Sequence, residues 1–340
     1  MLRLPDFDYV RPASVGEASR MLADRGGNAM AVAGGTDVYA KMKRGQFTPA
    51  CLVSLRGLAE LKGMDAEHPE GMWIGAGETL TRIARHAKAR QLFPALATAA
   101  HSVSTPQLRN LGTIGGNVFV DTRCNYYDQT FFWRQAVGFC MKKDGEKCLV
   151  APGSPRCVAV FSSDTAPVLM SLGAIAVLDG IAGERRVPFG ELYENDGMNF
   201  VRRRPEEILR AILIPRSTFG WRNTYLKLRR RGSFDFPVLG VAAAMDFAPD
   251  GVCVGARVAL TAVASAPLLV SAAPKLLEGK KASPELIEQV ADAAAKISHP
   301  LDNADMAYRY RKRMSRVFVA KALAALSGVS VALDGHPPWG

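Results

Sequence analysis

Four of the six cysteines in this chain are gathered in one segment, and this grouping limits what the segment can fold around. Cys124, Cys140, Cys148 and Cys157 lie in a stretch that is otherwise rich in aromatic, lysine and glycine residues. Four thiolates can hold an iron–sulfur cluster or a structural zinc ion, and four thiols can instead form two disulfides. The segment therefore predicts either a bound metal group or a cross-linked loop.

The spacing of these cysteines and the start of the chain help to distinguish an iron–sulfur cluster, a zinc ion and disulfides. The N-terminal sequence MLRLPDFDYVRPAS has no apolar core of a secretory signal, so we expect a reducing cytoplasm, where disulfides are rare. Structural zinc sites usually pair their cysteines as C-x2-4-C, but the gaps here are longer and contain no histidine. Long gaps suit a loop that wraps a larger group. A [4Fe–4S] cluster is favoured, with zinc and unconnected thiols left open.

Length and charge narrow the class of protein. A chain of 340 residues exceeds a usual single core, so about two or three domains are expected. No apolar run approaches the ~18 residues of a membrane span, so no membrane association is expected. The net charge of +11 arises from 43 basic residues interspersed with 32 acidic ones. A diffuse basic surface fits this pattern better than nucleic-acid binding, and an acidic protein partner remains open.

The pattern of helix and strand signals changes character near residue 220. In the first part, short apolar strands alternate with helices, and glycines follow the strands. Beyond Pro215 and Gly220, two long buried strands are predicted at 238–247 and 254–263, followed by helices. We therefore expect an α/β part at 1–220 and a smaller α+β part at 221–340.

Two glycine motifs follow short apolar runs in the α/β part. Gly34-Gly35-Thr36-Asp37 and Gly115-Gly116-Asn117 let backbone amides crowd against an anion, with a Thr or Asn side chain beside them. Each motif alone is more often a tight turn. Together they suggest two loops that grip one pyrophosphate, although neither matches a known nucleotide fingerprint.

Two further side chains allow two interpretations each. Asp164 either caps the helix that follows it or binds a sugar hydroxyl. Lys227 either contacts a phosphate or flavin, or is a surface lysine with a partly buried stem. No hydrolase motif or metal-like histidine spacing is present.

The order and spacing of the two glycine motifs carry a family resemblance. Ala33 to Asp37 followed by Thr113 to Asn117 resembles the FAD-binding medium subunits of the xanthine oxidase, or molybdenum hydroxylase, family. The resemblance extends over essentially the whole chain. It implies a PCMH-like FAD-binding domain of two α/β subdomains, followed by a smaller α+β C-terminal domain.

The cysteine segment marks a branch within this family. In ordinary members the Gly-Gly-Asn motif runs almost directly to the aspartate that corresponds to Asp164. Here residues 122–161 intervene and contain all four clustered cysteines. This insertion is similar to the one in the 4-hydroxybenzoyl-CoA reductase branch, which implies a [4Fe–4S] cluster with the four cysteines as its ligands.

The resemblance also assigns FAD contacts position by position. The pyrophosphate would be held by the amides around Ala33, Gly34, Gly35 and Thr36, with Asp37 and Val38 close by. The second loop would be lined by Thr113, Gly116 and Asn117. Val103 would lie near the ring system, Asp164 would bind ribityl hydroxyls, and Lys227 would lie near the isoalloxazine edge.

The function that the resemblance implies is electron transfer, with no catalytic residue in this chain. Its partners would be a small subunit with [2Fe–2S] clusters and a large subunit with a molybdenum cofactor, as a dimer of heterotrimers. Reduced ferredoxin would supply electrons, which pass the cluster and FAD toward molybdenum for reductive dehydroxylation to benzoyl-CoA. The alternatives are a subunit that oxidises another aromatic or heteroaromatic substrate, and a zinc-stapled interaction module.

Overall fold

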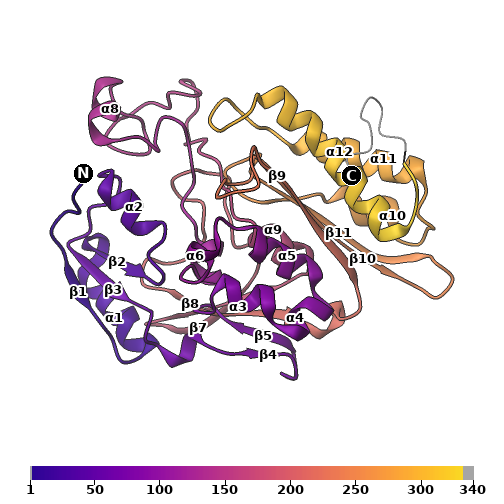
Figure 1. Ribbon diagram of the computed structural model, residues 1–340, viewed down its shortest axis with the longest axis horizontal. Coiled ribbons are helices and arrows are strands. Elements are labelled where there is room, and N and C mark those ends of the chain that lie inside the picture. The colour runs from indigo at the N-terminus through magenta and orange to yellow at the C-terminus, as the bar shows by residue number, and fades with distance from the viewer. Residues whose placement is uncertain (1, 332–340) are drawn as a thin grey trace.

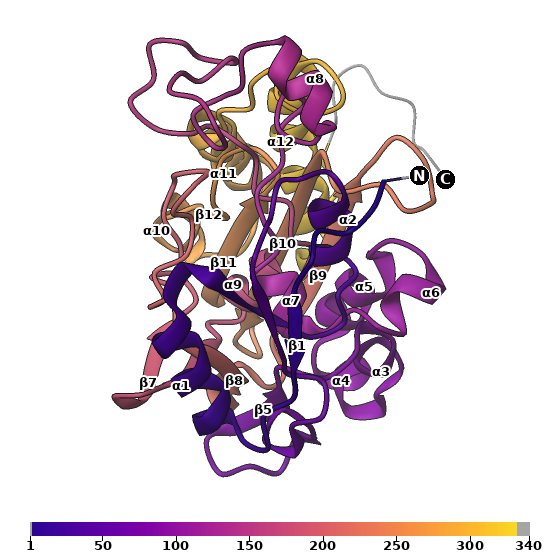
Figure 2. The ribbon, with the colours of Figure 1, turned by 90° about the vertical axis from the view of Figure 1, so that its left-hand side faces the viewer.

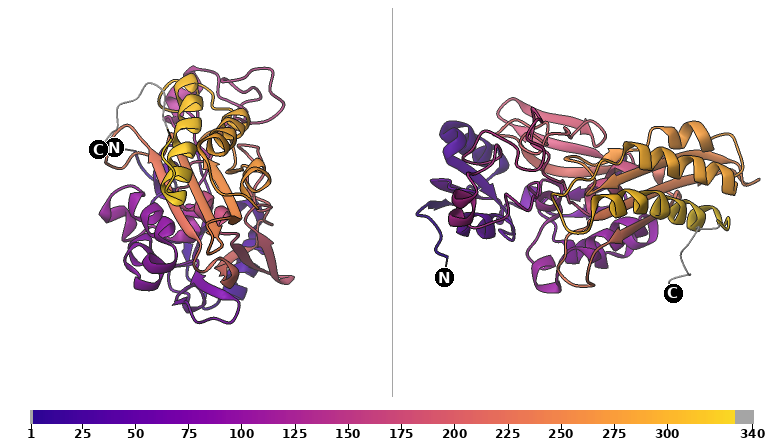
Figure 3. Two further views of the ribbon diagram at one scale, coloured as in Figure 1. Left: turned by 90° about the vertical axis from the view of Figure 1, so that its right-hand side faces the viewer. Right: turned by 90° about the horizontal axis from the view of Figure 1, so that it is seen from above.

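Within residues 2–331, the strands form three sheets that follow one another along the long axis of the molecule (Figures 1 and 3). The structure is a computed structural model that describes residues 2–331. Met1 and residues 332–340, at the outer ends of the two predicted domains, lie outside the described part.

The first sheet is parallel, with strand order β1-β3-β2. Its strands and helices are β1 (Asp8–Val10), α1 (Val15–Arg25), β2 (Ala29–Val32), α2 (Val38–Lys43) and β3 (Cys51–Ser54). Ser14 caps α1, because its Oγ accepts a hydrogen bond from the amide of Glu17 at 3.1 Å. Apolar residues of α1 pack against β3 and form the core of this part.

The second sheet is antiparallel, with strand order β4-β5-β8-β6-β7. Its strands are β4 (Met64–Asp65), β5 (Gly71–Gly75), β6 (Ile175–Gly180), β7 (Gly183–Pro188) and β8 (Ile208–Pro215). The helices of this part are α3 (Leu80–Arg85), α4 (Ala87–Leu92), α5 (Pro94–Ser102), α6 (Pro106–Arg109), α7 (Ile114–Val118) and α9 (Thr165–Ser171). A large apolar core joins the sheet to α3, α5 and α9.

The third sheet is also antiparallel, with strand order β12-β11-β10-β9. It contains β9 (Arg222–Leu228), β10 (Leu239–Phe247), β11 (Cys253–Thr261) and β12 (Leu268–Leu269). The helices α10 (Ala272–Leu277), α11 (Pro284–Ile297) and α12 (Tyr308–Ser327) cover one face of it (Figure 1). On the other face, α9 and α5 contact the sheet and link it to the second core.

The cysteine segment leaves the second part between α7 and α9. A pair of backbone hydrogen bonds between Arg123 and Val160, both at 2.7 Å, joins its two ends. The segment contains little regular structure apart from α8 (Phe131–Ala136). Figures 1 and 2 place α8 at the top of the molecule, above α2.

The expected fold class, an α/β part followed by an α+β part, is confirmed. One local expectation differs. The second glycine motif is not an open loop, because Gly115 and Gly116 lie inside the short helix α7, which Thr113 caps. Within residues 2–331, no helix combines the length and the apolar character that crossing a membrane requires.

Candidate functional site

The first glycine motif forms the turn between β2 and α2, with Ala33 directly after the strand and Val38 at the start of the helix. Gly35 has φ +70, a left-handed conformation that favours glycine. Within residues 2–331, the amides of Gly34, Gly35, Thr36 and Asp37 donate no hydrogen bond. A run of free amides in such a turn is a concave binding site for an anion.

The second motif packs its glycines closely against a neighbouring strand. A Cβ at Gly115 would lie 2.9 Å from the carbonyl oxygen of Ala76, just beyond β5. Gly116 donates its amide to Thr113 Oγ1 at 3.1 Å. A Cβ at Gly116 would meet only that oxygen, at 3.2 Å, so the space in front of Gly116 is otherwise open.

The two motifs lie side by side, although many residues separate them in the sequence. The backbone of Gly34 packs against the backbone of Leu111 and Gly112, just before Thr113. A Cβ at Gly112 would be 3.5 Å from Thr36 Oγ1. The fold therefore brings both predicted loops to one place, as two loops that grip one group require.

Asn117 connects the second motif to the start of α9. Its Oδ1 accepts hydrogen bonds from Ser163 Oγ at 2.8 Å, from the amide of Thr165 at 3.1 Å and from Thr165 Oγ1 at 2.7 Å. Ser163 Oγ in turn accepts from the amide of Ala166. The Asp164 side chain makes no cap hydrogen bond. The helix-cap interpretation of Asp164 is therefore wrong.

Asp164 is instead a buried carboxylate with partners on β9. Tyr225 donates its hydroxyl to Asp164 Oδ1 at 2.7 Å, and Lys227 Nζ lies 3.0 Å from Oδ2. Lys227 is not a surface lysine, because only 6% of its side chain is exposed. Burial lowers the pKa of Lys227, and Asp164 opposes that shift. Burial, with Asp164 adding to it, raises the pKa of Tyr225 well above its usual value.

Three cations surround the turn at Val103, the predicted neighbour of the flavin ring. Lys227 donates to the carbonyl of Ser102 at 2.9 Å, and Arg229 donates to the same oxygen at 3.3 Å. Arg109 donates to the carbonyls of Val103 and Ser104. Sequence reasoning missed Arg109, Arg229 and Tyr225, because Arg109 lies on α6, far from β9 in the sequence, and the three residues form no motif.

The four clustered cysteines line a single cavity. All four are buried and free, so no disulfide joins them. Tyr126, Tyr127, Met141 and Val150 supply an apolar wall around Cys124 and Cys157. The amide of Ala159 donates to Cys157 Sγ at 3.4 Å.

The protonation of these thiols depends on what the cavity holds. Burial raises the pKa of Cys124 to about 12 and also raises the pKa of Cys157. Thiolates at these positions therefore need a compensating cation, which a metal group would supply. Among residues 2–331, no three or more His, Cys, Asp and Glu side chains are arranged to hold a metal ion.

The cysteine segment is joined to the first glycine motif and to α2 by ion pairs that are at least partly buried. Arg123 forms ion pairs with Asp37 and, at 3.5 Å, with Asp128. Lys41 of α2, whose side chain is almost fully buried, lies 2.8 Å from Asp121. Lys41 and Asp121 were not singled out from the sequence, because isolated charges in a basic chain resemble surface residues.

Two of the basic residues of the segment also turn inward. Arg134 is buried and binds Asp144 at 2.9 Å and the carbonyl of Gly45 at 3.0 Å. Lys142 pairs with Asp121 at 2.8 Å. The outer surface of the segment is therefore less basic than its sequence indicates.

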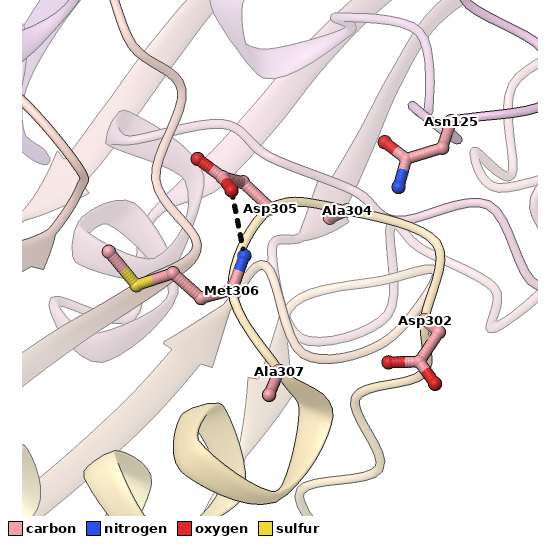
Figure 4. A pocket seen from close by; sticks show the side chains of 6 residues that line it. All are labelled: Asn125, Asp302, Ala304, Asp305, Met306 and Ala307. Carbon is pink, nitrogen blue, oxygen red and sulfur yellow. Dashed lines mark hydrogen bonds between the residues drawn. The ribbon is translucent and has the colours of Figure 1, made fainter.

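An open hollow lies beside the cysteine segment, at the loop before α12 (Figure 4). Asn125, Asp302 and Asp305 contribute polar side chains to it. Asp305 accepts from the amide of Met306 at 2.9 Å and pairs with Arg230 at 2.8 Å. The Asp305 carboxylate therefore already has partners within the protein, and we assign no ligand to the hollow.

Comparisons with known proteins agree with this arrangement. Residues 5–217 match the family described as the FAD binding domain in molybdopterin dehydrogenase. Residues 223–326 match the CO dehydrogenase flavoprotein C-terminal domain.

Individual relatives cover nearly the whole chain. The carbon monoxide dehydrogenase medium chain of Afipia carboxidovorans is 28% identical over 93% of this chain and 95% of that one. The aldehyde oxidoreductase FAD-binding subunit PaoB of Escherichia coli (strain K12) is 30% identical over 81% of this chain and 87% of that subunit. A solved structure of carbon monoxide dehydrogenase from Hydrogenophaga pseudoflava has a TM-score of 0.77, with 27% identity over 96% of this chain and 99% of that one. The chain belongs to the FAD-binding medium subunits of the xanthine oxidase and CO dehydrogenase family, and so to the oxidoreductases of the molybdenum hydroxylase family.

Proposed function

We propose that this chain transfers electrons between a [4Fe–4S] cluster and FAD in a molybdenum-containing 4-hydroxybenzoyl-CoA reductase. The observation that carries the proposal is the single cavity lined by Cys124, Cys140, Cys148 and Cys157, beside the first glycine motif. FAD supplies exchange of one or two electrons, so it can connect a one-electron cluster to a two-electron reaction.

The donor set of the cavity favours a cluster over zinc. Structural zinc sites usually pair their cysteines as C-x2-4-C, whereas the gaps between these four cysteines are longer and contain no histidine. Four buried thiols line one cavity with an apolar wall, and four cysteine thiolates are the usual ligand set of a [4Fe–4S] cluster. The amide of Ala159 would donate to the Cys157 thiolate and partly neutralise it.

The geometry of the glycine motifs supports their proposed FAD roles. The free amides from Gly34 to Asp37 would bind the pyrophosphate, with Ala33 and Val38 beside them. Thr113 and Asn117 keep the second motif in place, and Gly116 leaves space next to it.

The remaining roles concern the sugar chain and the ring. Asp164 would bind ribityl hydroxyls, and Lys227 and Val103 would lie near the isoalloxazine. Tyr225 and Lys227 hold the Asp164 side chain in place before FAD binds.

Analysis of the purified complex tests the cofactor content. Beyond the iron and sulfide of the [2Fe–2S] subunit, we expect about four iron and four sulfide per chain with one FAD, and an EPR signal from one cluster on this subunit. Flavin absorbance without iron or sulfide in this chain would contradict the cluster proposal and leave the family assignment intact.

The substrate assignment rests on the resemblance of the insertion to that of the reductase branch. We expect the complete complex, with its small [2Fe–2S] and large molybdenum subunits as a dimer of heterotrimers in the cytoplasm, to form benzoyl-CoA from 4-hydroxybenzoyl-CoA with reduced ferredoxin. The second candidate is an oxidising enzyme, because the relatives named above are dehydrogenases and an aldehyde oxidoreductase. Turnover of an aromatic or heteroaromatic substrate with an electron acceptor, and none with reduced ferredoxin, would favour that candidate.

A further inference from the structure

Lys142 points into the molecule and places its ammonium group beside the cysteine cavity. Only 7% of its side chain is exposed, and the residue itself lines the cavity. Its Nζ lies 2.8 Å from Asp121 Oδ1 and 2.6 Å from Thr122 Oγ1. A third hydrogen bond, at 2.5 Å, goes to the carbonyl oxygen of Gly197. The ammonium group is therefore fixed rather than mobile.

Gly197 connects this ammonium group to one of the four thiols. The amide of Gly197 donates to the carbonyl of Cys157 at 2.8 Å. A Cβ at Gly197 would lie 2.7 Å from Cys157 Sγ, so the backbone there directly contacts the sulfur. The carbonyl that holds Lys142 thus belongs to a residue in contact with a proposed ligand.

The charge of Lys142 is only partly neutralised. Its carboxylate partner, Asp121, is shared with Lys41, whose Nζ lies 2.8 Å from the other carboxylate oxygen. Burial alone would raise the pKa of Asp121, but Lys142 and Lys41 lower it, so the carboxylate is ionised. Lys41 also pairs with Asp128 at 3.4 Å, so Lys142 shares its carboxylate partner with an ammonium group that has a second partner of its own. Because the site is buried, solvent ions screen these charges weakly.

We propose that Lys142 raises the reduction potential of the group that the four cysteines hold, and that Asp121 limits this effect. The inference rests on the proposed cluster. Reduction adds one negative charge to the group, and a fixed positive charge nearby stabilises the reduced state. Lys142 would act as a positioned charge and not as a ligand.

Two substitutions with opposite effects on the local charge test this inference. Lys142→Met keeps most of the side-chain volume and removes the positive charge, so it should lower the potential. Asp121→Asn keeps the shape and removes the negative charge, so it should raise the potential. Lys147→Met is the control, because Lys147 is an exposed lysine of the same segment. EPR-monitored redox titration of the holo complex gives the potential, and iron and sulfide analysis gives the cluster content.

The expected change is about tenfold in the equilibrium constant for reduction, or about 59 mV for a one-electron couple, with opposite signs in the two variants. If the substitutions merely loosened the cavity, the change in reduction potential would not have opposite signs in the two variants. If Lys142→Met does not retain iron, the sign of the change in reduction potential of Asp121→Asn tests the inference alone.

Four outcomes would overturn the inference. The first is an unshifted potential in loaded Lys142→Met, and the second is a shift of the same sign in both variants. The third is an unshifted or lowered potential in Asp121→Asn when only that variant retains iron. The fourth is loss of iron from both variants with normal content in Lys147→Met, which would assign these charges to cluster assembly. Absence of iron from the wild-type chain would instead reject the proposed cluster itself, and the inference with it.

Discussion

Arg123 forms an ion pair with Asp37, so the residue directly before Cys124 is bound to the turn that follows β2. The guanidinium of Arg123 also stacks over Phe236 with its carbon 3.8 Å from the ring centre. The first sheet, the cysteine segment and the C-terminal half therefore meet at one side chain. The proposed flavin and cluster sites adjoin, but they use different residues, which makes them separable by mutation.

Cys140→Ser should lose iron and sulfide, because a serine hydroxyl does not replace a thiolate as a cluster ligand. We expect the variant to fold and to bind FAD, since none of the proposed FAD contacts lies on residue 140. The measurement is iron, sulfide and flavin on one purified sample. Cys253→Ser is the matched control, because Cys253 is a buried free cysteine of β11 that does not line the cavity. Full iron content in Cys140→Ser would reject Cys140 as a ligand.

Gly116→Val should weaken FAD binding by at least about tenfold, since the new side chain would extend into the open space beside the second motif. Fluorescence titration of the flavin-free protein measures the affinity. Gly16→Val, at an exposed position in α1, is the control and should bind FAD normally. Gly35 is less informative, because φ +70 and the close ring of Tyr39 would strain any substitution there. Wild-type affinity in Gly116→Val would place FAD elsewhere.

Lys227→Met should lower the free energy of unfolding by about 3 kcal/mol, because it leaves the buried Asp164 carboxylate without its cation. The double variant Asp164→Asn, Lys227→Met removes both charges and should recover most of this loss. Chemical denaturation of wild type, Lys227→Met, Asp164→Asn and the double variant forms a double-mutant cycle. Strictly additive losses would show that the two side chains do not interact.

Glu207→Gln should cost about 1–2 kcal/mol at neutral pH and nothing at low pH. Arg185 binds Glu207 through two hydrogen bonds at 2.8 and 2.7 Å, and the amide of Arg204 adds a third. Burial opposes ionisation of Glu207, but these partners lower its pKa. A lowered carboxyl pKa stabilises the fold above the unfolded value of about 4.3, and this contribution disappears as the pH falls through the folded pKa.

Unfolding midpoints of wild type and Glu207→Gln, compared across pH, check this expectation. The two curves should converge in acid. A constant difference from pH 7 to below 4 would show that the ionisation of Glu207 contributes nothing.

Local signals were sufficient for many elements of the fold. Ser14 and Ser283 cap the starts of α1 and α11 through hydrogen bonds to amides three residues on, and Gly328 in the left-handed conformation ends α12. Each of these signals depends only on a few neighbouring residues. The order of strands in the second sheet, β4-β5-β8-β6-β7, depends on contacts between distant segments and was not predictable in this way.

In the candidate site, too, some residues can be recognised from the sequence and others depend on contacts between distant segments. The cysteines and glycines stand out because their chemistry is unusual in any context. Lys41, Asp121 and Gly197 do not, because an ordinary lysine, aspartate or glycine acquires its role only from burial and from neighbours far along the chain. The helical state of Gly115 and Gly116 was also missed, since glycine disfavours helices and only the cap by Thr113 and the close approach to Ala76 account for it.

The paired hydrogen bonds between Arg123 and Val160 have a consequence for how such a chain can vary. They hold the two ends of the cysteine segment next to each other, at the entrance to α9. Because the entropy of closing a loop grows only slowly with its length, the chain between two adjacent anchors can lengthen or shorten at small cost. A metal-binding module can thus be gained or lost at this point while the surrounding flavoprotein keeps its architecture.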